Sequence, residues 1–179
     1  MEQNKDIFDA ILKNTYTRKQ ALKRLGLIKD FLNLLFFDLK PDTTFNQALN
    51  DFEQSLIYKH SADQSSELKF LENLGANFFK QFEPQTFHIK LAALEKDLLS
   101  VKIITLYLPF ELPEVEVDKL GSWFKKNLGN SSLFEINLDP NLIGGTAISI
   151  NGVYKDYSLK QKIKVNQEQI EKLLTSFPK

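Results

Sequence analysis

The sequence predicts an α+β protein in which an N-terminal helix bundle precedes a small α/β domain with a mixed sheet. Up to about residue 99, apolar residues recur at spacings of three and four, which is typical of amphipathic helices. From residue 100 the spacing shortens, and β-branched and aromatic residues become frequent, as in strands. Asn151-Gly152 then separates two short strand-like runs and predicts a tight hairpin. We therefore expect one domain over residues 1–99 and a second over residues 100–179.

Helical stretches fill the first half of the chain. We expect five of them, over residues 7–12, 18–39, 45–57, 67–82 and 87–99. The second stops before Pro41 and the fourth before Pro84, because proline restricts the preceding residue and lacks an N–H donor. Thr43 or Thr44 can cap the third. Helices this short are marginal alone, so they must pack on one another as a bundle.

The second half predicts the order β-α-β-β-β-α. Strands are expected over residues 101–108, 132–138, 146–150 and 153–157, and helices over 114–127 and from Ser158 to Phe177, with a break near 164–166. The first strand is apolar on both faces, which favours a central, buried position. Two strands joined through a helix are most simply parallel and right-handed, and the hairpin then adds an antiparallel edge.

Composition limits the classes of function. The chain has 179 residues, and its 23 Lys and Arg balance its 23 Asp and Glu, so nothing argues for a polyanionic partner. The absence of Cys excludes disulfides and thiolate chemistry. The longest apolar run, residues 31–39, is interrupted by Asn33 and Asp38 and is too short to span a bilayer. Residues 1–6 carry acids and lack a signal core, so we expect a cytosolic bacterial protein.

Few residues offer catalytic or metal chemistry. His60 and His88 are the only imidazoles, and His60 with Asp63 could form a metal or general-base site, although an exposed helix-end histidine is the favoured interpretation. Gly144-Gly145 could be taken for a phosphate loop, but no Gly-Lys-Ser/Thr follows and the next element is a strand. We therefore expect no catalytic residue, no metal site and no cofactor.

Three other groups have both a structural and a functional interpretation. Glu114, Glu116 and Asp118 are interpreted as a solvated first helical turn that complements the helix dipole. Trp123 and Phe124 are adjacent on one helix, so one should pack inside while the other offers a contact surface. A nucleic-acid contact is a less favoured alternative for three lysines near two tyrosines, namely Lys160, Lys162 and Lys164 near Tyr154 and Tyr157.

An ordered motif stands out in the second half. A turn, Pro140-Asn141-Leu142-Ile143-Gly144-Gly145, precedes alternating residues up to Ile150, and Asn151-Gly152, Asp156 and Ser158 follow before a basic helix start. The order and spacing resemble the C-terminal signature of the F-type ATP synthase delta subunit, the oligomycin-sensitivity-conferring protein of mitochondria. The chain departs from that family at Ser149, where Arg is frequent, and at Tyr157, where Gly is frequent.

The motif also has a physical interpretation. Gly144-Gly145 would allow positive φ or a close backbone approach at the entry of a strand. Asp156 and Ser158 would end a strand and cap the last helix, because their oxygens can accept its free amides. Residues of this kind fix a fold and hold no substrate.

The resemblance implies a non-catalytic peripheral-stalk (stator) subunit that holds the catalytic head still against rotor torque. The helical domain, of six helices in the family, would bind the N-terminal segments of the alpha subunits, and the C-terminal domain would bind the C-terminal helices of the b subunits. The protein would lie at the cytoplasmic face of a bacterial cell membrane, attached through the complex. The alternative is an unrelated protein–protein adaptor whose α/β domain is similar by convergence. As partner-binding residues we predict Ile7, Phe8, Ile11 and Leu12 for the head, and Ile163, Ile170, Leu173 and Leu174 for the stalk.

Overall fold

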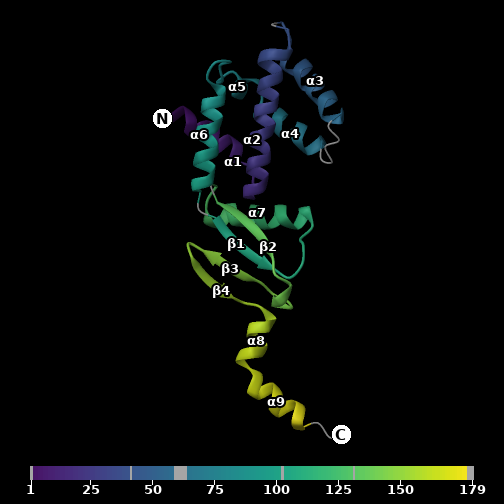
Figure 1. Cartoon of the computed structure of the whole chain (residues 1–179), viewed down its shortest axis with the longest axis vertical. Helices are drawn as coiled ribbons and strands as arrows, with labels where there is room; N and C mark the ends of the chain where they lie inside the picture. Colours follow the sequence, from purple (N-terminus) through teal and green to yellow (C-terminus); the bar gives the residue numbers. More distant parts are fainter. Residues whose placement is uncertain (1, 41, 59–63, 102, 131, 177–179) are drawn as a thin grey trace. The chain divides into compact units, whose positions relative to one another are not determined.

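The computed structural model describes residues 2–40, 42–58, 64–101, 103–130 and 132–176 (Figure 1). The chain forms two compact units, Met1–Thr15 with Lys19–Val101, and Tyr16–Arg18 with Lys102–Lys179. The first unit is helical and the second contains a four-stranded mixed sheet. The predicted α+β fold class is therefore confirmed.

Six α-helices build the described part of the first unit. They are α1 (Glu2–Leu12), α2 (Arg18–Asn33), α3 (Phe45–Tyr58), α4 (Gln64–Leu74), α5 (Ala76–Phe79) and α6 (Phe87–Ser100), and a π-helical turn, η1 (Leu34–Asp38), extends α2. The Thr44 hydroxyl accepts from the Gln47 amide at 3.4 Å, and the Gln47 side chain accepts from the Thr44 amide at 2.9 Å. This reciprocal capping box confirms the predicted start of α3.

The expectation of a single helix over residues 67–82 was wrong. Gly75 has φ of +72°, a left-handed conformation that ends α4, and its amide donates to the Leu71 carbonyl at 3.2 Å. The chain then starts again as α5. Glycine reaches this conformation without steric cost, so the break falls inside an otherwise continuous helical pattern.

Phenylalanine dominates the core of the helical unit. Phe31 of α2 is fully buried, and its ring meets those of Phe45, Phe52 and Phe79 edge-on, with centroids 4.8 to 5.8 Å apart. Edge-to-face pairs add to the stabilisation that apolar burial provides. The apolar helical spacing in the sequence therefore corresponds to one shared aromatic core.

The sheet of the second unit has the order β2-β1-β3-β4. Its strands are β1 (Ile103–Leu108), β2 (Leu133–Leu138), β3 (Ala147–Ile150) and β4 (Val153–Asp156). β1 and β2 are parallel, with Ile103 opposite Leu133, while β1–β3 and β3–β4 are antiparallel. This arrangement confirms the predicted parallel pair and antiparallel hairpin.

Helix α7 (Glu114–Leu128) shares a core with the sheet, in which Phe124 of the helix packs with three strand residues, Ile104, Leu106 and Phe134. On the helix, Phe124 is 7% exposed and its neighbour Trp123 is 56% exposed, as expected for adjacent residues. β1 is central, but only Ile104 and Leu106 are buried, and its alternate residues are half-buried. The expectation that both faces of this strand are buried was therefore wrong, since alternate residues point to opposite faces.

A short segment from near the N-terminus belongs to the second unit. Thr17 pairs in parallel with Phe134 of β2, whose amide donates to the Tyr16 carbonyl at 3.0 Å. Arg18 lies 3.4 Å from the Glu135 carboxylate. The Tyr16 ring packs on Gly121 so closely that a Cβ there would come within 2.2 Å of it. The segment therefore extends the sheet beyond β2, which the sequence did not indicate.

Candidate partner-binding surfaces

The motif residues form a tight corner between β2 and β3. Pro140–Leu142 make one 3₁₀ turn (η2), and the Asp139 carboxylate accepts from the Asn141 amide at 3.1 Å. Ile143 and Gly145 then adopt positive φ, +66° and +77°. We call residues 139–145 the glycine corner.

The glycine corner lies against the start of the last helical region. A Cβ on Gly145 would lie 2.7 Å from the Tyr157 carbonyl oxygen, so this position excludes larger residues both by its φ and by space. The Leu159 amide donates to the Gly144 carbonyl at 2.8 Å, and the Tyr157 amide donates to the Thr146 carbonyl at 2.9 Å. The corner thus fixes where the chain leaves the sheet, and Gly145 has both the positive φ and the close backbone approach that were predicted for the glycine pair.

Asp156 and Ser158 cap the helix that begins there. Ser158 is fully buried, and its hydroxyl accepts from the Gln161 amide at 3.2 Å. The Asp156 carboxylate accepts from the Ser158 amide at 2.8 Å. Hydrogen bonds from the side chain and then the backbone of Ser158, together with the charge of Lys160, hold the pKa of Asp156 below its ordinary value. The predicted strand-end and N-cap pair is confirmed.

The hairpin at the other end of β3 also has the predicted form. Asn151 and Gly152 have φ of +52° and +80°, the signs that a type I′ turn requires at both central positions. A Cβ at Gly152 would meet nothing within 4 Å, so backbone conformation alone favours glycine there.

Two short helices follow the cap, α8 (Leu159–Val165) and α9 (Gln167–Ser176), separated at Asn166, which is close to the predicted break. Several large apolar side chains on them are exposed: Leu159, Ile163, Val165 and Leu173. Ile170 is half-buried, and the side chain of Leu174 lies outside the described residues. We call these two helices the C-terminal helix surface (Figure 1, yellow). Several exposed apolar residues of this size on two consecutive helices favour a surface that a partner covers.

A hollow lies at the β3–β4 hairpin. It measures about 280 Å³ and is lined by Ile148, Ile150, Val153, Lys155 and Tyr157 of the hairpin. Lys155 lies opposite Ile148 and Val153 opposite Ile150, so alternate residues place these side chains on one face. Sequence analysis missed this hollow, although the alternation of these residues was the signal that could have located it.

The predicted head-contact residues of α1 lie mostly inside the bundle. Ile7, Ile11 and Leu12 are only 1–2% exposed, and Phe8 is half-buried at the margin of the core. Among these four side chains, only Phe8 therefore has surface to offer a partner in this conformation.

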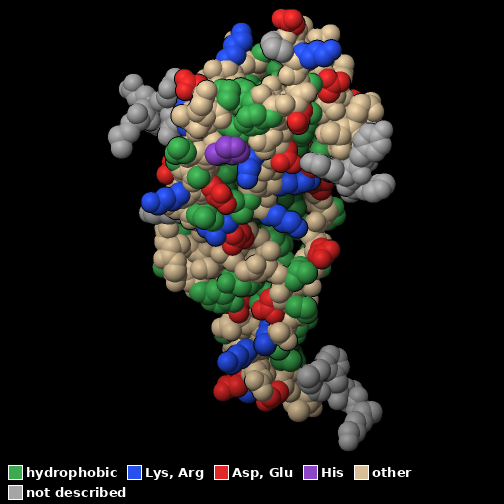
Figure 2. All heavy atoms as spheres, turned by 45° about the horizontal axis from the view of Figure 1, so that its top comes forward, with side chains coloured by type: hydrophobic (Ala, Val, Ile, Leu, Met, Phe, Trp, Pro, Cys, Tyr) green, Lys and Arg blue, Asp and Glu red, His purple; other side chains and the backbone are tan. Residues whose placement is uncertain are grey.

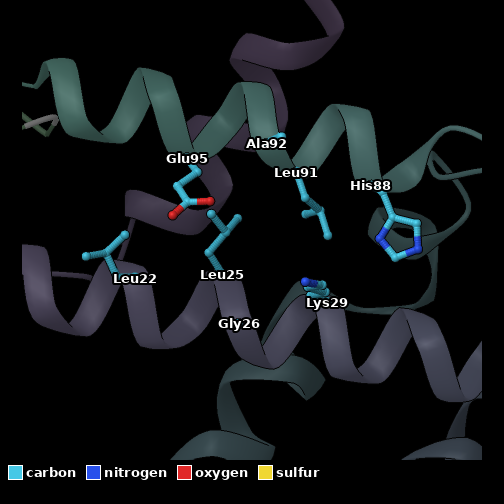
Figure 3. Close-up of a pocket in the computed structure, with 8 residues that line it drawn as sticks. All are labelled: Leu22, Leu25, Gly26, Lys29, His88, Leu91, Ala92 and Glu95. Carbon is cyan, nitrogen blue, oxygen red and sulfur yellow. The ribbon is translucent and has the colours of Figure 1, made fainter.

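A groove lies between α2 and α6 of the helical unit (Figure 3). It measures about 430 Å³ and is lined by Leu22, Leu25, Gly26 and Lys29 of α2 and by His88, Leu91, Ala92 and Glu95 of α6. His88, Leu91 and Glu95 point from α6 toward α2, with Lys29 near His88 at one end and Glu95 near Leu22 at the other. Figure 2 shows hydrophobic side chains interspersed with acidic and basic ones on the face that it presents. Sequence analysis did not predict this groove.

The remaining chemical candidates that the structure describes are exposed. Glu116 pairs with Lys119 at 2.8 Å in the exposed first turns of α7. His60 and Asp63 lie outside the described residues, and within the described ranges no three His, Asp or Glu side chains gather as metal ligands. Lys160, Lys162 and Lys164 are exposed on α8, beside the exposed Tyr154 and Tyr157. Across the described segments, no helix has both the length and the apolar character needed to cross a membrane.

Comparison with known protein families finds a match that lies mostly in the second half of the chain. Residues 85–170 match the family model of the ATP synthase delta (OSCP) subunit. The match starts just before α6, includes the whole sheet, the glycine corner and the Ser158 cap, and ends at Ile170 of α9. No curated protein matches the chain. The resemblance found in the motif is therefore confirmed over this range.

Proposed function

We propose that the chain is a peripheral-stalk subunit of the ATP synthase delta (OSCP) family, whose model residues 85–170 match, and that it links the catalytic head to the b-subunit stalk. In this role the helical unit binds the alpha subunits and the second unit binds the b subunits. The protein then resists the torque of the rotor, so that proton flow drives ATP synthesis. It lies at the cytoplasmic face of a bacterial membrane, held there by the complex.

The main support for this proposal is that the glycine corner fixes the start of the C-terminal helix surface, whose apolar side chains are exposed. Gly145, Asp156 and Ser158 use backbone contacts to fix the point where α8 begins. Apolar side chains on α8 and α9 then remain exposed. A rigid support carrying uncovered apolar residues suits a lasting protein contact and provides no reacting group.

For the stalk contact we propose the C-terminal helix surface, including the predicted Ile163, Ile170, Leu173 and Leu174. Leu173 is 62% exposed, so it can be buried by a partner helix without repacking the fold. Helix-to-helix contacts of this kind place apolar anchors along one stripe. The hollow lined by Ile150, Val153 and Tyr157 offers further apolar area on the same unit.

For the head contact we propose the predicted α1 residues, but with two different roles. Ile7, Ile11 and Leu12 would hold α1 in the core, while Phe8 would be the side chain that reaches a partner. A change at Phe8 should then weaken head binding more than it lowers stability.

The first experiment is affinity capture of the full chain with the alpha and b subunits of its synthase. We expect both to be captured by the wild-type protein. Leu173→Asp should lose most of the b-subunit capture, because a carboxylate would be desolvated in an apolar contact, while alpha-subunit capture and the melting transition stay unchanged.

A matched control is Thr175→Asp, which adds the same single negative charge at an exposed position two residues further along α9. Equal loss from both variants would indicate a general charge effect and would contradict an apolar contact at Leu173. Loss of the cooperative melt in Leu173→Asp would place this residue in the fold and not at the partner.

A further inference from the structure

Three residues between α1 and α2, Tyr16–Arg18, belong to the C-terminal unit, although the residues on both sides of them belong to the helical unit. We call these three residues the strap. The chain passes between the two units after residue 15, after residue 18 and after residue 101. If the strap detached from the sheet, only the passage after residue 101 would still connect the units.

The side chain of Tyr16 has a seat on α7. Gly121 lies in the interior of this helix, where glycine is among the weakest helix formers, and its φ is not positive. A Cβ at Gly121 would come within 2.5 Å of three Tyr16 atoms, including the Cβ and Cγ, which rotation of the ring cannot move away. The space that Tyr16 occupies therefore accounts for glycine at this position.

Polar groups on the same side of α7 also contact the ring. The Ser122 hydroxyl donates to the Tyr16 hydroxyl at 3.1 Å. The Lys125 ammonium lies 5.8 Å from the ring centroid, a distance at which a cation attracts the face of an aromatic ring. Lys125 is buried and donates to the Asn130 carbonyl at 2.7 Å, so its position is fixed. The seat thus recognises both the face and the hydroxyl of a tyrosine.

The pairing of the strap with the sheet is short. Thr17 forms an isolated bridge with Phe134 of β2, whereas β1 pairs with β2 over six residues. The Arg18–Glu135 ion pair is about one-third exposed on both sides, and exposed ion pairs contribute little to stability. A sheet edge of this length can open locally while the rest of the unit stays folded.

The helical unit holds the chain on both sides of the strap. Just before it, the buried Thr15 hydroxyl accepts from Arg24 of α2 at 2.7 Å, and Arg24 also donates to the Asn14 carbonyl. At its other end, Arg18 is the first residue of α2. The strap therefore has little slack, and any movement of α1 and α2 relative to the sheet must stretch it or detach it.

We propose that the strap is a reversible latch. When it is closed, it ties the end of α1 and the start of α2 to the edge of β2. When it is open, the two units move more freely relative to each other. This inference concerns the chain by itself and does not depend on the proposed function, so either can fail without the other.

The seat is tested by Gly121→Ala in the full chain. The added Cβ should displace Tyr16, and the Phe134 amide, which donates to the Tyr16 carbonyl, should exchange its hydrogen roughly tenfold faster by NMR. The matched control is Gly26→Ala in the interior of α2, where a Cβ would meet nothing within 4 Å. It should change this exchange by less than about twofold. Unchanged exchange in Gly121→Ala would overturn the latch.

A second variant opens the strap from the other side. Tyr16→Ala leaves α7 intact and should accelerate exchange at Phe134 by a similar factor. Gly121→Ala added to Tyr16→Ala should then change the exchange by less than about twofold, because the strap is already open. Two independent, additive effects would mean that Tyr16 and Gly121 do not act through one contact, and would overturn the seat.

The movement itself is measured with spin labels. The chain has no Cys, so Gln54→Cys in α3 and Lys126→Cys in α7 place one label on an exposed position of each unit. Pulsed electron spin resonance should give a distance distribution about 1.5-fold broader with Tyr16→Ala or Gly121→Ala than without them. Equal widths would overturn the latch, even if the exchange at Phe134 accelerates.

A pair of labels within the helical unit is the control for that measurement. Gln54→Cys with Asp97→Cys places both labels on exposed positions of this unit. Its distance distribution should be the same with and without Tyr16→Ala. If this distribution broadens as much as the first, the helical unit itself has loosened, which would contradict a latch between the units.

Discussion

The helical unit and the C-terminal unit are specified by different kinds of residue. In the helical unit, large apolar side chains such as Phe31 and Phe52 fill a core that many combinations of similar volume could fill. In the C-terminal unit, Gly145 allows a positive φ and a close backbone approach, while Asp156 and Ser158 accept hydrogen bonds from backbone amides. Few other residues can take these places. A recognisable motif is therefore expected in the second unit, and the family match does cover it while leaving residues 1–84 outside.

The largest effect should come from Gly145→Val. Valine at φ of +77° adds about 1–3 kcal/mol of backbone strain, and its Cβ would clash with the Tyr157 carbonyl, adding about 1–3 kcal/mol more. The free energy of unfolding should fall by about 2–6 kcal/mol in urea titrations. The probe is the fluorescence of Trp123, the single tryptophan, which reports on the C-terminal unit.

Gly152→Ala is the control for that variant. Gly152 also has positive φ, but its surroundings are open, so only about 1 kcal/mol should be lost. An equal loss at both positions would remove close approach as the reason for glycine at the corner.

The second effect should come from Phe31→Leu in the helical unit. Leucine keeps most of the apolar volume but loses three edge-to-face contacts, so the cost should be about 1–2 kcal/mol. Circular dichroism at 222 nm, which is dominated by the helices, should show the change. If Phe31→Leu lowered the free energy of unfolding more than Gly145→Val, the helical unit would be the less tolerant of the two, which contradicts the comparison.

A smaller effect should come from Ser158→Ala. The variant removes the acceptor of the Gln161 amide at the start of α8, which typically costs about 1 kcal/mol. Amide hydrogen exchange should accelerate at Gln161. Unchanged protection there would mean that the glycine corner holds α8 without the cap.

The smallest effect should be the pH dependence of the Asp156 cap. The folded protein lowers the pKa of this carboxyl, so its contribution is complete above the ordinary value of 3.8 and is lost as the pH falls through the folded value. Acid titration followed by NMR should show the Ser158 amide moving as Asp156 protonates. Asp156→Asn should remove this titration, and its persistence in the variant would assign it to another group.

The sequence predicted most of the C-terminal unit because its signals are local. Asn151-Gly152, Gly144-Gly145 and the Ser158 cap each constrain a few adjacent residues, and the four strands and the break near Asn166 follow from alternation and spacing. The Gly75 break was missed because one glycine inside a helical pattern is compatible with a continuous helix.

The partner surfaces were harder to predict because exposure depends on tertiary packing. The apolar stripe of α1 has the same spacing whether it faces a core or a partner, and the structure buries Ile7, Ile11 and Leu12. The α2–α6 groove combines residues from two helices more than fifty positions apart, and no periodicity in either helix reveals which neighbour it will meet.

The three residues Tyr16–Arg18 belong to the C-terminal unit but are synthesised long before the rest of it. The Tyr16 hydroxyl lies 3.1 Å from the Ser122 hydroxyl, a residue 106 positions later in the chain. When Tyr16 leaves the ribosome, neither β2 nor Gly121 has yet been translated, and chains emerge at about 5–20 residues per second. The segment between α1 and α2 therefore has to remain available for several seconds, and this sheet edge forms only after β2, which ends at residue 138 of 179, has been made.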